Sequence, residues 1–396
     1  MRGIPRMVLG AKEGLGLNNG ATFGTAVAAL ALHDAENLTR HAEIGAAMCL
    51  EALLGFRDAF LPHVQAVRGQ IGQMATAERV LRFVQDGTLA DGDLHRDPNT
   101  LPPQDAYSLR TVPQTIGAIW DTLAFVRQLI TRELNAATDN PLIFDLPEGD
   151  PLHLPRAYKT ISGGNFHGTP IGYAMDFLSI VITDLASMSE RRIYRLVSQP
   201  ESHGLPPMLI EEEAFGQPSG MMIPQYVASA LVSACKTLAH PDSVDSIPTS
   251  AGREDFVSMS MNAALHGRQI IAHASHVIAI ELLCAHLALQ WRLKNLTHLL
   301  DHTPLDPYTH IPLANRTRTD EAVLFHQREG LRPQAGRGTS AALSAIQSAL
   351  AGLPPLGDAP AVVDRFTQPY IGRVHQLLQQ QTLVKAVYKA VDLDGQ

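Results

Sequence analysis

A phenol and a guanidinium lie three residues apart in residues 104–110, which read Gln-Asp-Ala-Tyr-Ser-Leu-Arg and directly precede a helix-starting Thr-Val-Pro. If this turn is helical, Tyr107 and Arg110 project to the same side. A guanidinium can hold a carboxylate through two parallel hydrogen bonds, and a neighbouring phenol can move a proton. The pair therefore suits a substrate that carries a carboxylate. Taken alone, the same pattern also fits a surface arginine beside a half-buried tyrosine.

Two further loops carry residues that could take part in chemistry. Residues 162–168, Ser-Gly-Gly-Asn-Phe-His-Gly, need unusual backbone angles and present Phe166 on a turn. Residues 249–255, Thr-Ser-Ala-Gly-Arg-Glu-Asp, fit either a helix N-cap with acidic residues in its first turn or a positioned carboxylate, Glu254. An ordinary interhelical turn would explain the first loop equally well, so neither loop identifies a function by itself.

Other well-known kinds of site find little support in the sequence. In residues 14–20 the third glycine is one place late for G-x-G-x-x-G, and no strand precedes it, so a dinucleotide site is not expected. His273, His276 and His286 lie near Cys284, but without H-E-x-x-H or paired cysteines they are expected to pack rather than to bind metal. The sequence contains neither a G-x-S-x-G motif nor a P-loop motif.

Helical periodicity dominates the elements that must position these loops. After Pro113, apolar residues recur three or four positions apart, from Ile116 to Leu134, until residues 138–141, Thr-Asp-Asn-Pro, end the helix. Residues 172–194, 226–238 and 259–293 are apolar on more than one side, as is typical of helices inside a bundle. A final amphipathic helix is expected to run to about Val391. Runs of alternating β-branched residues are nearly absent.

This pattern predicts an all-α fold, a bundle of long antiparallel helices. We expect residues 1–294 to form a helical core that carries the active-site loops. Proline, glycine and mixed charges become more frequent from about residue 295. Residues 295–396 are therefore expected to form a C-terminal helical cap.

Composition narrows the possible partners and surroundings. The net charge is -8 and Lys and Arg form no run, so nucleic acid is not expected as a partner. Only 18% of the residues are charged, which suggests surface hidden in an oligomer. Three widely spaced cysteines, Cys49, Cys235 and Cys284, lie in apolar stretches and indicate reduced core thiols. No secretion signal and no membrane span are expected, and the predicted location is the cytoplasm.

Six motifs occur in order along the chain. They are residues 12–20 (Lys-Glu-Gly-Leu, later Asn-Gly), 104–110, 162–167, 189–192 (Ser-Glu-Arg-Arg), 238–246 (Leu-Ala-His-Pro, later Ser and Asp-Ser) and 254–259 (Glu-Asp-x-Val-Ser-Met). Over residues 8 to 293 this series resembles the histidine ammonia-lyase family, which also includes tyrosine and phenylalanine ammonia-lyases and related aminomutases. The fumarase and aspartase group is not matched, because residues 220–224 only echo its G-S-x-x-M-P-x-K-x-N loop.

The resemblance implies a role for each matched position. Asn19 and Arg110 resemble the pair that holds the substrate carboxylate, and Tyr107 resembles a tyrosine that transfers a proton beside the reacting carbon. Gln104 resembles the glutamine that orients the prosthetic group, and Phe166 resembles the aromatic residue packed near it, where it would also contact the substrate.

Glu254 resembles the acidic residue near the substrate side chain and amine, and we expect it to be catalytic together with Tyr107. A glutamate at this position is more typical of the histidine-specific branch, whereas plant phenylalanine enzymes carry glutamine. Residues 168–172 nevertheless read closer to the phenylalanine branch. The expected substrate is therefore an aromatic amino acid, with histidine slightly favoured over tyrosine and phenylalanine.

One departure from the family is the absence of an Ala-Ser-Gly tripeptide from the sequence. The family cyclises this tripeptide, upstream of residues 12–15, into its 4-methylideneimidazol-5-one electrophile, so no such cofactor is expected to form from this chain. A single acid or base supplies only about 10²- to 10⁴-fold, which cannot replace a covalent electrophile. The chain alone is expected to be inactive as a lyase.

Three interpretations follow. In the first, an N-terminal lyase chain carrying Ala-Ser-Gly joins this chain in a tetramer-type assembly, as the family's active sites resemble composites of three subunits. In the second, Met1 is an internal start and upstream sequence is missing. In the third, the chain is a non-catalytic scaffold or regulatory subunit. An aminomutase outcome is the alternative to elimination of ammonia.

Overall fold

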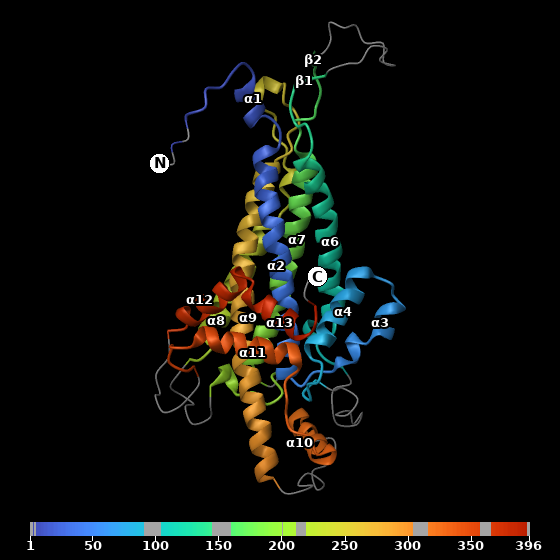
Figure 1. The fold of residues 1–396 in the computed structure, drawn as a ribbon, viewed down its shortest axis with the longest axis vertical. Helices are drawn as coiled ribbons and strands as arrows, with labels where there is room; N and C mark the ends of the chain where they lie inside the picture. Colours follow the sequence, from blue (N-terminus) through green and yellow to red (C-terminus); the bar gives the residue numbers. More distant parts are fainter. Residues whose placement is uncertain are drawn as a thin grey trace. The chain divides into compact units, whose positions relative to one another are not determined.

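The computed structural model describes residues 3, 5–90, 104–144, 160–199, 201–210, 219–303, 316–356 and 366–393. Within these residues the regular secondary structure is helical, apart from one antiparallel pair of two-residue strands, β1 (Leu142–Ile143) and β2 (Thr160–Ile161), and isolated bridge pairing. The longest helices are α2 (Thr22–Ala52), α6 (Val112–Leu134), α7 (Thr169–Val197), α8 (Met222–Leu238) and α9 (Ser260–His302). Helices α2, α6, α7 and α9 can be followed in Figure 1. The predicted all-α fold is confirmed.

The shorter helices complete the chain. They are α1 (Glu13–Asn18), α3 (Pro62–Ala66), α4 (Ile71–Phe83), α5 (Tyr107–Arg110), α10 (Arg318–Glu329), α11 (Arg337–Leu350), α12 (Gln368–Gln379) and α13 (Thr382–Ala390). The single helix expected before Val391 is two helices, because Gln381 adopts a left-handed φ of 58° between α12 and α13.

Helix α6 shows how the sequence pattern becomes structure. The apolar residues spaced three or four apart, such as Ile116, Leu123 and Ile130, are buried. Leu134 is exposed instead, because it is the last residue of the helix. The helix ends at Leu134, earlier than the turn at residues 138–141 that was expected to end it.

The chain divides into two compact units that are interleaved along the sequence. The first comprises Met1–Asp34, Thr122–Ile180 and Leu238–Ile270, and the second comprises Ala35–Asp121, Val181–Thr237 and Ile271–Gln396. The second unit thus combines residues from both sides of position 294. The division at 294 into core and cap stays a prediction.

In the first unit, segments of α2, α6, α7 and α9 lie side by side, with β1 and β2 beyond their ends (Figure 1). Small residues allow the close approach. A Cβ on Gly168 would come within 2.4 Å of Ser260 Oγ, and one on Gly267 within 2.7 Å of Met175. Phe125 of α6 packs edge-on against Phe177 of α7, with ring centroids 5.9 Å apart.

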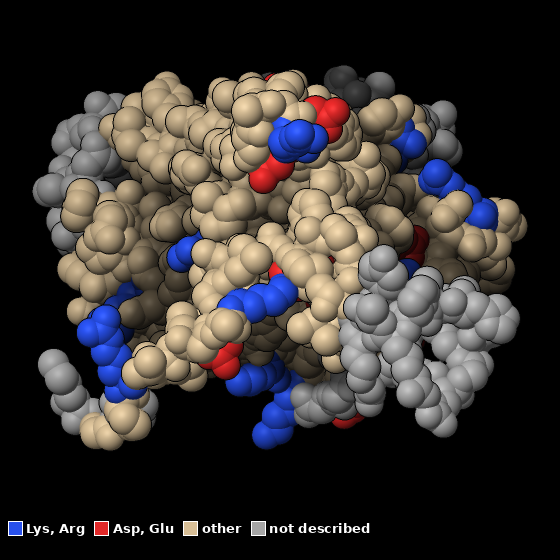
Figure 2. Space-filling model, turned by 90° about the horizontal axis from the view of Figure 1, so that it is seen from above, with Lys and Arg blue, Asp and Glu red and all other residues tan. Residues whose placement is uncertain are grey.

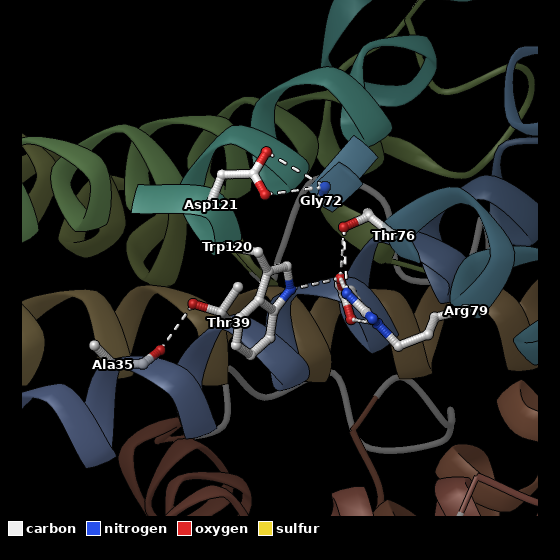
Figure 3. A network of polar contacts seen from close by, with 8 residues as sticks. Ala35, Thr39, Gly72, Thr76, Arg79, Trp120 and Asp121 are labelled. Atoms are coloured by element: carbon white, nitrogen blue, oxygen red, sulfur yellow. Dashed lines mark hydrogen bonds and ion pairs between the residues drawn. The ribbon is translucent and has the colours of Figure 1, made fainter. Parts of the chain in front are cut away.

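In the second unit, a buried carboxylate joins three helices. Glu43 of α2 accepts hydrogen bonds from Thr76 Oγ1 (2.9 Å) and Arg79 (2.7 Å) of α4, and from Trp120 Nε1 (2.9 Å) of α6. Figure 3 shows Thr76, Arg79 and Trp120 converging from their two helices. Because each donor meets the same charge, this network fixes the relative register of α2, α4 and α6.

The C-terminal helices belong to the same unit. Helix α11 packs against α4, α12 and α13. At the start of α11, Gly336 N donates 2.8 Å to the buried carboxylate of Glu51, which also accepts from Thr339 Oγ1. The segment expected to be a peripheral cap therefore contacts the interior of the second unit.

Three stretches are long and apolar enough to cross a membrane by length and composition: Glu13–Ala52, Thr169–Val197 and Ser260–His302. The expectation of no membrane span rests on a stricter criterion, a run of about 18 uncharged apolar residues, whereas mean hydropathy tolerates the scattered polar residues of these three helices. Most of the apolar window is already buried in the last two, at 61% and 78%. Burial inside a bundle therefore accounts for much of their apolar character.

Charged side chains are sparse at the surface. On the face shown in Figure 2, Lys and Arg are scattered among uncharged atoms. This distribution agrees with the low charged fraction of the sequence, 18%. The described residues on this face show no concentrated positive charge of the kind with which proteins follow a phosphate backbone.

Candidate active site

The six predicted site residues fall into two groups, one in each compact unit. Asn19, Phe166 and Glu254 belong to the first unit, and Gln104, Tyr107 and Arg110 belong to the second.

Asn19 follows α1 and is held by a carboxylate. Its backbone N–H donates 2.8 Å to Leu15 O, and its side-chain Nδ2 donates 2.8 Å to Asp139 Oδ1. Lys12 forms an ion pair with the same carboxylate. The Lys12 ammonium, followed by the Asn19 amide, lowers the pKa of Asp139 to about 2. Asp139 is therefore an anion at neutral pH and fixes the direction of the Asn19 amide.

The next residue links a second loop to the same turn. Asn140 Oδ1 accepts hydrogen bonds from Ser162 Oγ at 3.0 Å and from Gly163 N at 2.8 Å. Leu142 and Ile161 then pair in the β1–β2 ladder. Residues 139 and 140 thus connect the Asn19 segment with the Phe166 loop. The sequence interpretation treated this turn only as a helix stop, although Asp and Asn side chains in turns commonly accept backbone hydrogen bonds.

Phe166 is half-buried on its loop, and the neighbouring His167 anchors the loop. His167 Nε2 donates to Phe256 O at 3.0 Å, and Nδ1 forms a hydrogen bond of 2.7 Å with Thr169 Oγ1. The His167 and Phe256 rings are stacked, with an interplanar angle of 7°. On the other side of Phe166, Cβ atoms built on Gly163 and Gly164 would meet nothing within 4 Å. The loop is therefore anchored at one end and open at the other.

Glu254 is exposed and lies in a tight loop rather than in a helix. Thr249 Oγ1 donates 2.8 Å to Glu254 Oε2, and the two residues form an isolated antiparallel bridge. Thr249 is the N-cap residue of a short 3-10 helix, Ser250–Gly252, but its side chain caps no backbone N–H and the first turn holds no acidic residue. The N-cap alternative is therefore confirmed for the position of Thr249 and wrong for the acidic first turn, and helix α9 begins only at Ser260. Among the described residues Oε1 has no hydrogen-bond donor, so it can accept from a further group, as the alternative of a positioned carboxylate requires.

In the second unit, α5 brings Tyr107 and Arg110 together as their spacing predicts. The Arg110 guanidinium carbon lies 4.6 Å from the centroid of the Tyr107 ring. Tyr107 is 69% exposed, while Arg110 Nε is buried and has no hydrogen-bond partner among the described residues. Gln104, three residues before Tyr107, is also exposed. The Arg110 guanidinium, whose Nε–H can still donate a hydrogen bond, thus lies next to the exposed phenol of Tyr107.

A buried ion pair supports α5. Arg192 of α7 donates to Ser108 O at 3.4 Å and pairs with Glu281 of α9, with Nη2 3.2 Å from Oε2. Both side chains of the pair are fully buried. The nearby Cys49 thiol is buried too, and desolvation raises its pKa well above the ordinary value. Residues 189–192 were recognised only as part of a motif, and their contact with α5 was not predicted.

The remaining cysteines and histidines take no part in this arrangement. Cys235 and Cys284 are buried thiols, as expected, and burial raises the pKa of Cys235 to about 11. His286 is buried on α9, and desolvation lowers its pKa to about 4. A neutral, buried imidazole of this kind agrees with its expected role in packing.

The chain is similar to known proteins in both sequence and fold. The sequence profile described as aromatic amino acid lyase matches residues 1–305. Histidine ammonia-lyase of Bacillus subtilis (strain 168) is 49% identical over 290 residues, which are 73% of this chain and 54% of that protein. Histidine ammonia-lyase of Geobacillus sp. (strain WCH70) is 48% identical over 290 residues, with the same two shares. The chain spans about half the length of the curated relatives it matches.

Solved structures show the same fold. Histidine ammonia-lyase from Trypanosoma cruzi is 32% identical, with a TM-score of 0.74 over 98% of this chain and 61% of that one. Tyrosine aminomutase from Streptomyces globisporus is 29% identical, with a TM-score of 0.78 over 100% of this chain and 67% of that one. Phenylalanine ammonia-lyase from Rhodosporidium toruloides, 18% identical with a TM-score of 0.75 over 98% and 69%, shares the fold. By sequence and by fold, this chain belongs to the aromatic amino acid lyase family.

Proposed function

We propose that this chain forms the substrate-binding part of an aromatic amino acid ammonia-lyase, with histidine slightly favoured over tyrosine and phenylalanine. Elimination breaks the C–N bond and a β C–H bond of the substrate and releases ammonia and an arylacrylate. The observation that carries the proposal is the α5 pair, in which the buried Arg110 Nε, without a hydrogen-bond partner in the described part of the chain, lies beside the exposed Tyr107.

Each of the chain's own residues has a task in this proposal. Arg110 holds the substrate carboxylate through its fork of donors, and Asn19 supplies a second donor whose direction Asp139 sets. Tyr107 moves a proton beside the reacting carbon. Glu254 uses Oε1 for the substrate side chain or amine, while Thr249 holds Oε2.

Elimination also needs an electrophile, which the family's 4-methylideneimidazol-5-one group supplies when it is bound. Gln104 and Phe166 fit neighbours of such a planar group, since one is an exposed amide and the other a half-buried ring beside two unobstructed glycines. We propose that an Ala-Ser-Gly segment outside these 396 residues provides the group, either upstream in the same polypeptide or in a partner chain.

Reconstitution tests this function. The chain is co-expressed with the Ala-Ser-Gly-bearing N-terminal part of a histidine ammonia-lyase, and urocanate formation from histidine is followed by absorbance. We expect turnover by the pair and none by this chain alone. Arg110→Ala should reduce kcat/KM about 10- to 100-fold, because a charged hydrogen bond to the carboxylate is lost. Assembly of the pair with no effect of Arg110→Ala would favour a scaffold or regulatory subunit instead.

An aminomutase is the second candidate, and the similarity to tyrosine aminomutase favours it. The two activities share the removal of ammonia and differ in its return to the β-carbon. Chromatography of the reaction with tyrosine would distinguish them, because a β-amino acid appears only with the aminomutase. An arylacrylate as the sole product supports the lyase.

We propose that the chain works as an oligomer in the cytoplasm. Large apolar side chains are exposed on helices of the first unit, including Phe23, Leu30, Phe125, Phe177 and Ile180. Exposed apolar surface of this extent favours association with a second copy or with the N-terminal chain, and buried thiols suit a reducing compartment. Sedimentation should show an oligomer, and a clean monomer would contradict the proposal.

A further inference from the structure

The segment that carries Gln104, Tyr107 and Arg110 also contains a buried carboxylate. Asp105 lies between Gln104 and Tyr107, and its side chain is 1% exposed. Asp105 Oδ2 accepts a hydrogen bond of 2.6 Å from Phe56 N, and Oδ1 accepts one of 2.6 Å from Arg318. Both oxygens of the carboxylate therefore have buried donors.

Arg318 is the first residue of α10 and lies beyond the residues 1–305 that match the family profile. Its side chain is 3% exposed. The Nη1 group that contacts Asp105 also donates 3.2 Å to Leu54 O, and the guanidinium carbon lies 4.3 Å from the centroid of the Phe56 ring. One guanidinium thus joins Asp105 to the turn that follows α2.

A second arginine ties the neighbouring residue of α10 to the same turn. Arg292 of α9 donates 3.0 Å to Ala52 O, the last residue of α2, and 3.0 Å to Thr319 Oγ1. Because Arg292 is fully buried and donates to the Ala52 carbonyl oxygen at the negative end of α2, it stabilises this helix terminus. The start of α10 is therefore held at two consecutive positions.

We propose that Asp105 and Arg318 are positioning residues for the substrate site, and that the C-terminal segment of this chain sets the position of Gln104, Tyr107 and Arg110. The positioning role rests on the proposed function, but the experiment below tests the anchoring of these residues without measuring that function. Removing one partner of a buried ion pair leaves an uncompensated charge and lets the surrounding backbone move. Such movement reaches the substrate groups directly, since Tyr107 is only two residues from Asp105.

Hydrogen–deuterium exchange on the full chain tests the anchoring without any need for turnover. In Arg318→Met and Asp105→Asn, amides of residues 107–111 should exchange at least tenfold faster, while amides of α11 keep their rate. Arg337→Gln is the control, because Arg337 and Asp86 form an exposed pair 3.9 Å apart in the same unit. Unchanged exchange at residues 107–111, or an equal rise in α11, would overturn the proposal.

If Arg318→Met and Asp105→Asn do not fold, the milder variant Arg318→Lys still tests the proposal. A lysine can reach Asp105 but cannot bind Leu54 O with the same planar group, so the rise in exchange should be smaller than in Arg318→Met. In the reconstituted enzyme, Arg318→Lys should raise KM for histidine more than it lowers kcat, at a temperature where both proteins are folded. If reconstitution yields no activity, the exchange result still decides the anchoring, and the proposed function alone fails.

Discussion

Gly20 follows Asn19 with φ at +80°, and a Cβ there would lie 2.1 Å from the carbonyl oxygen of Thr138. Gly252 has the same φ of +80°, but its Cβ would meet nothing within 4 Å. Gly252→Ala should therefore cost about 1 kcal/mol of unfolding free energy, the cost of a left-handed alanine. Gly20→Ala should cost roughly 1–3 kcal/mol more, because the turn that holds Asn19 must move.

Urea unfolding of the two variants measures this difference. Equal losses of unfolding free energy would show that the close approach of Gly20 to Thr138 does not constrain the turn. The comparison is specific because both glycines belong to the first unit and share a backbone conformation.

At the same scale, local spacing predicted some contacts and could not predict others. Tyr107 and Arg110 meet because residues three apart share a helix face. Asp139 and Asp105 act through partners 120 and 213 positions away, Asn19 and Arg318. No periodicity encodes such a partner, so a carboxylate that organises a site looks like an ordinary turn residue in the sequence.

Among the elements, α4 offers a matched pair of arginines. Arg79 binds the fully buried Glu43, whereas Arg82 pairs with the exposed Glu78 of the same helix. Arg79→Met leaves the Glu43 carboxylate with Thr76 and Trp120 as its donors among the described residues, and should cost about 3–5 kcal/mol of unfolding free energy. Arg82→Met should cost no more than about 0.5 kcal/mol. Chemical denaturation checks both values, and similar losses for the two variants would refute a central role for Glu43.

The helices also differ in how clearly the sequence pattern predicts them. Helix α6 has one apolar stripe and could be placed closely, and α7 and α9 extend beyond the predicted residues 172–194 and 259–293. Helix α2 was not singled out, although it has 31 residues. Its second half is buried at almost every position, so apolar residues do not concentrate on one face and the helical period is weak.

For the whole molecule, buried histidines govern stability on the acid side. Burial is the main cause that lowers the pKa of His41 to about 4, of His203 to about 3 and of His286 to about 4. The unfolded chain takes up protons at these positions below the ordinary value of 6.5, while the folded chain does not. The free energy of unfolding should therefore fall as pH decreases from about 6.5 to about 4.

Glu51 has the opposite effect. Burial, partly offset by the hydrogen bonds from Thr339 and Gly336, raises its pKa to about 8 from an ordinary 4.5. The folded protein keeps this proton up to about pH 8, whereas the unfolded chain has lost it above about 4.5. The stability from Glu51 is complete below pH 4.5 and is lost as the pH rises toward 8.

The two effects together predict a maximum of stability near pH 6.5 to 7. Below this pH, the stability lost through the three histidines exceeds the stability gained through the one carboxyl group. Above it, the histidines are neutral in both the folded and the unfolded state, so among these four groups only Glu51 still changes the free energy of unfolding. Urea unfolding from pH 5 to 8.5 should show this maximum, and Glu51→Gln should flatten the decline between pH 7 and 8 while keeping the loss below pH 6.5. If Glu51→Gln declines between pH 7 and 8 as steeply as the parent, another group carries the alkaline effect, and the contact between α2 and the start of α11 is not a protonated one.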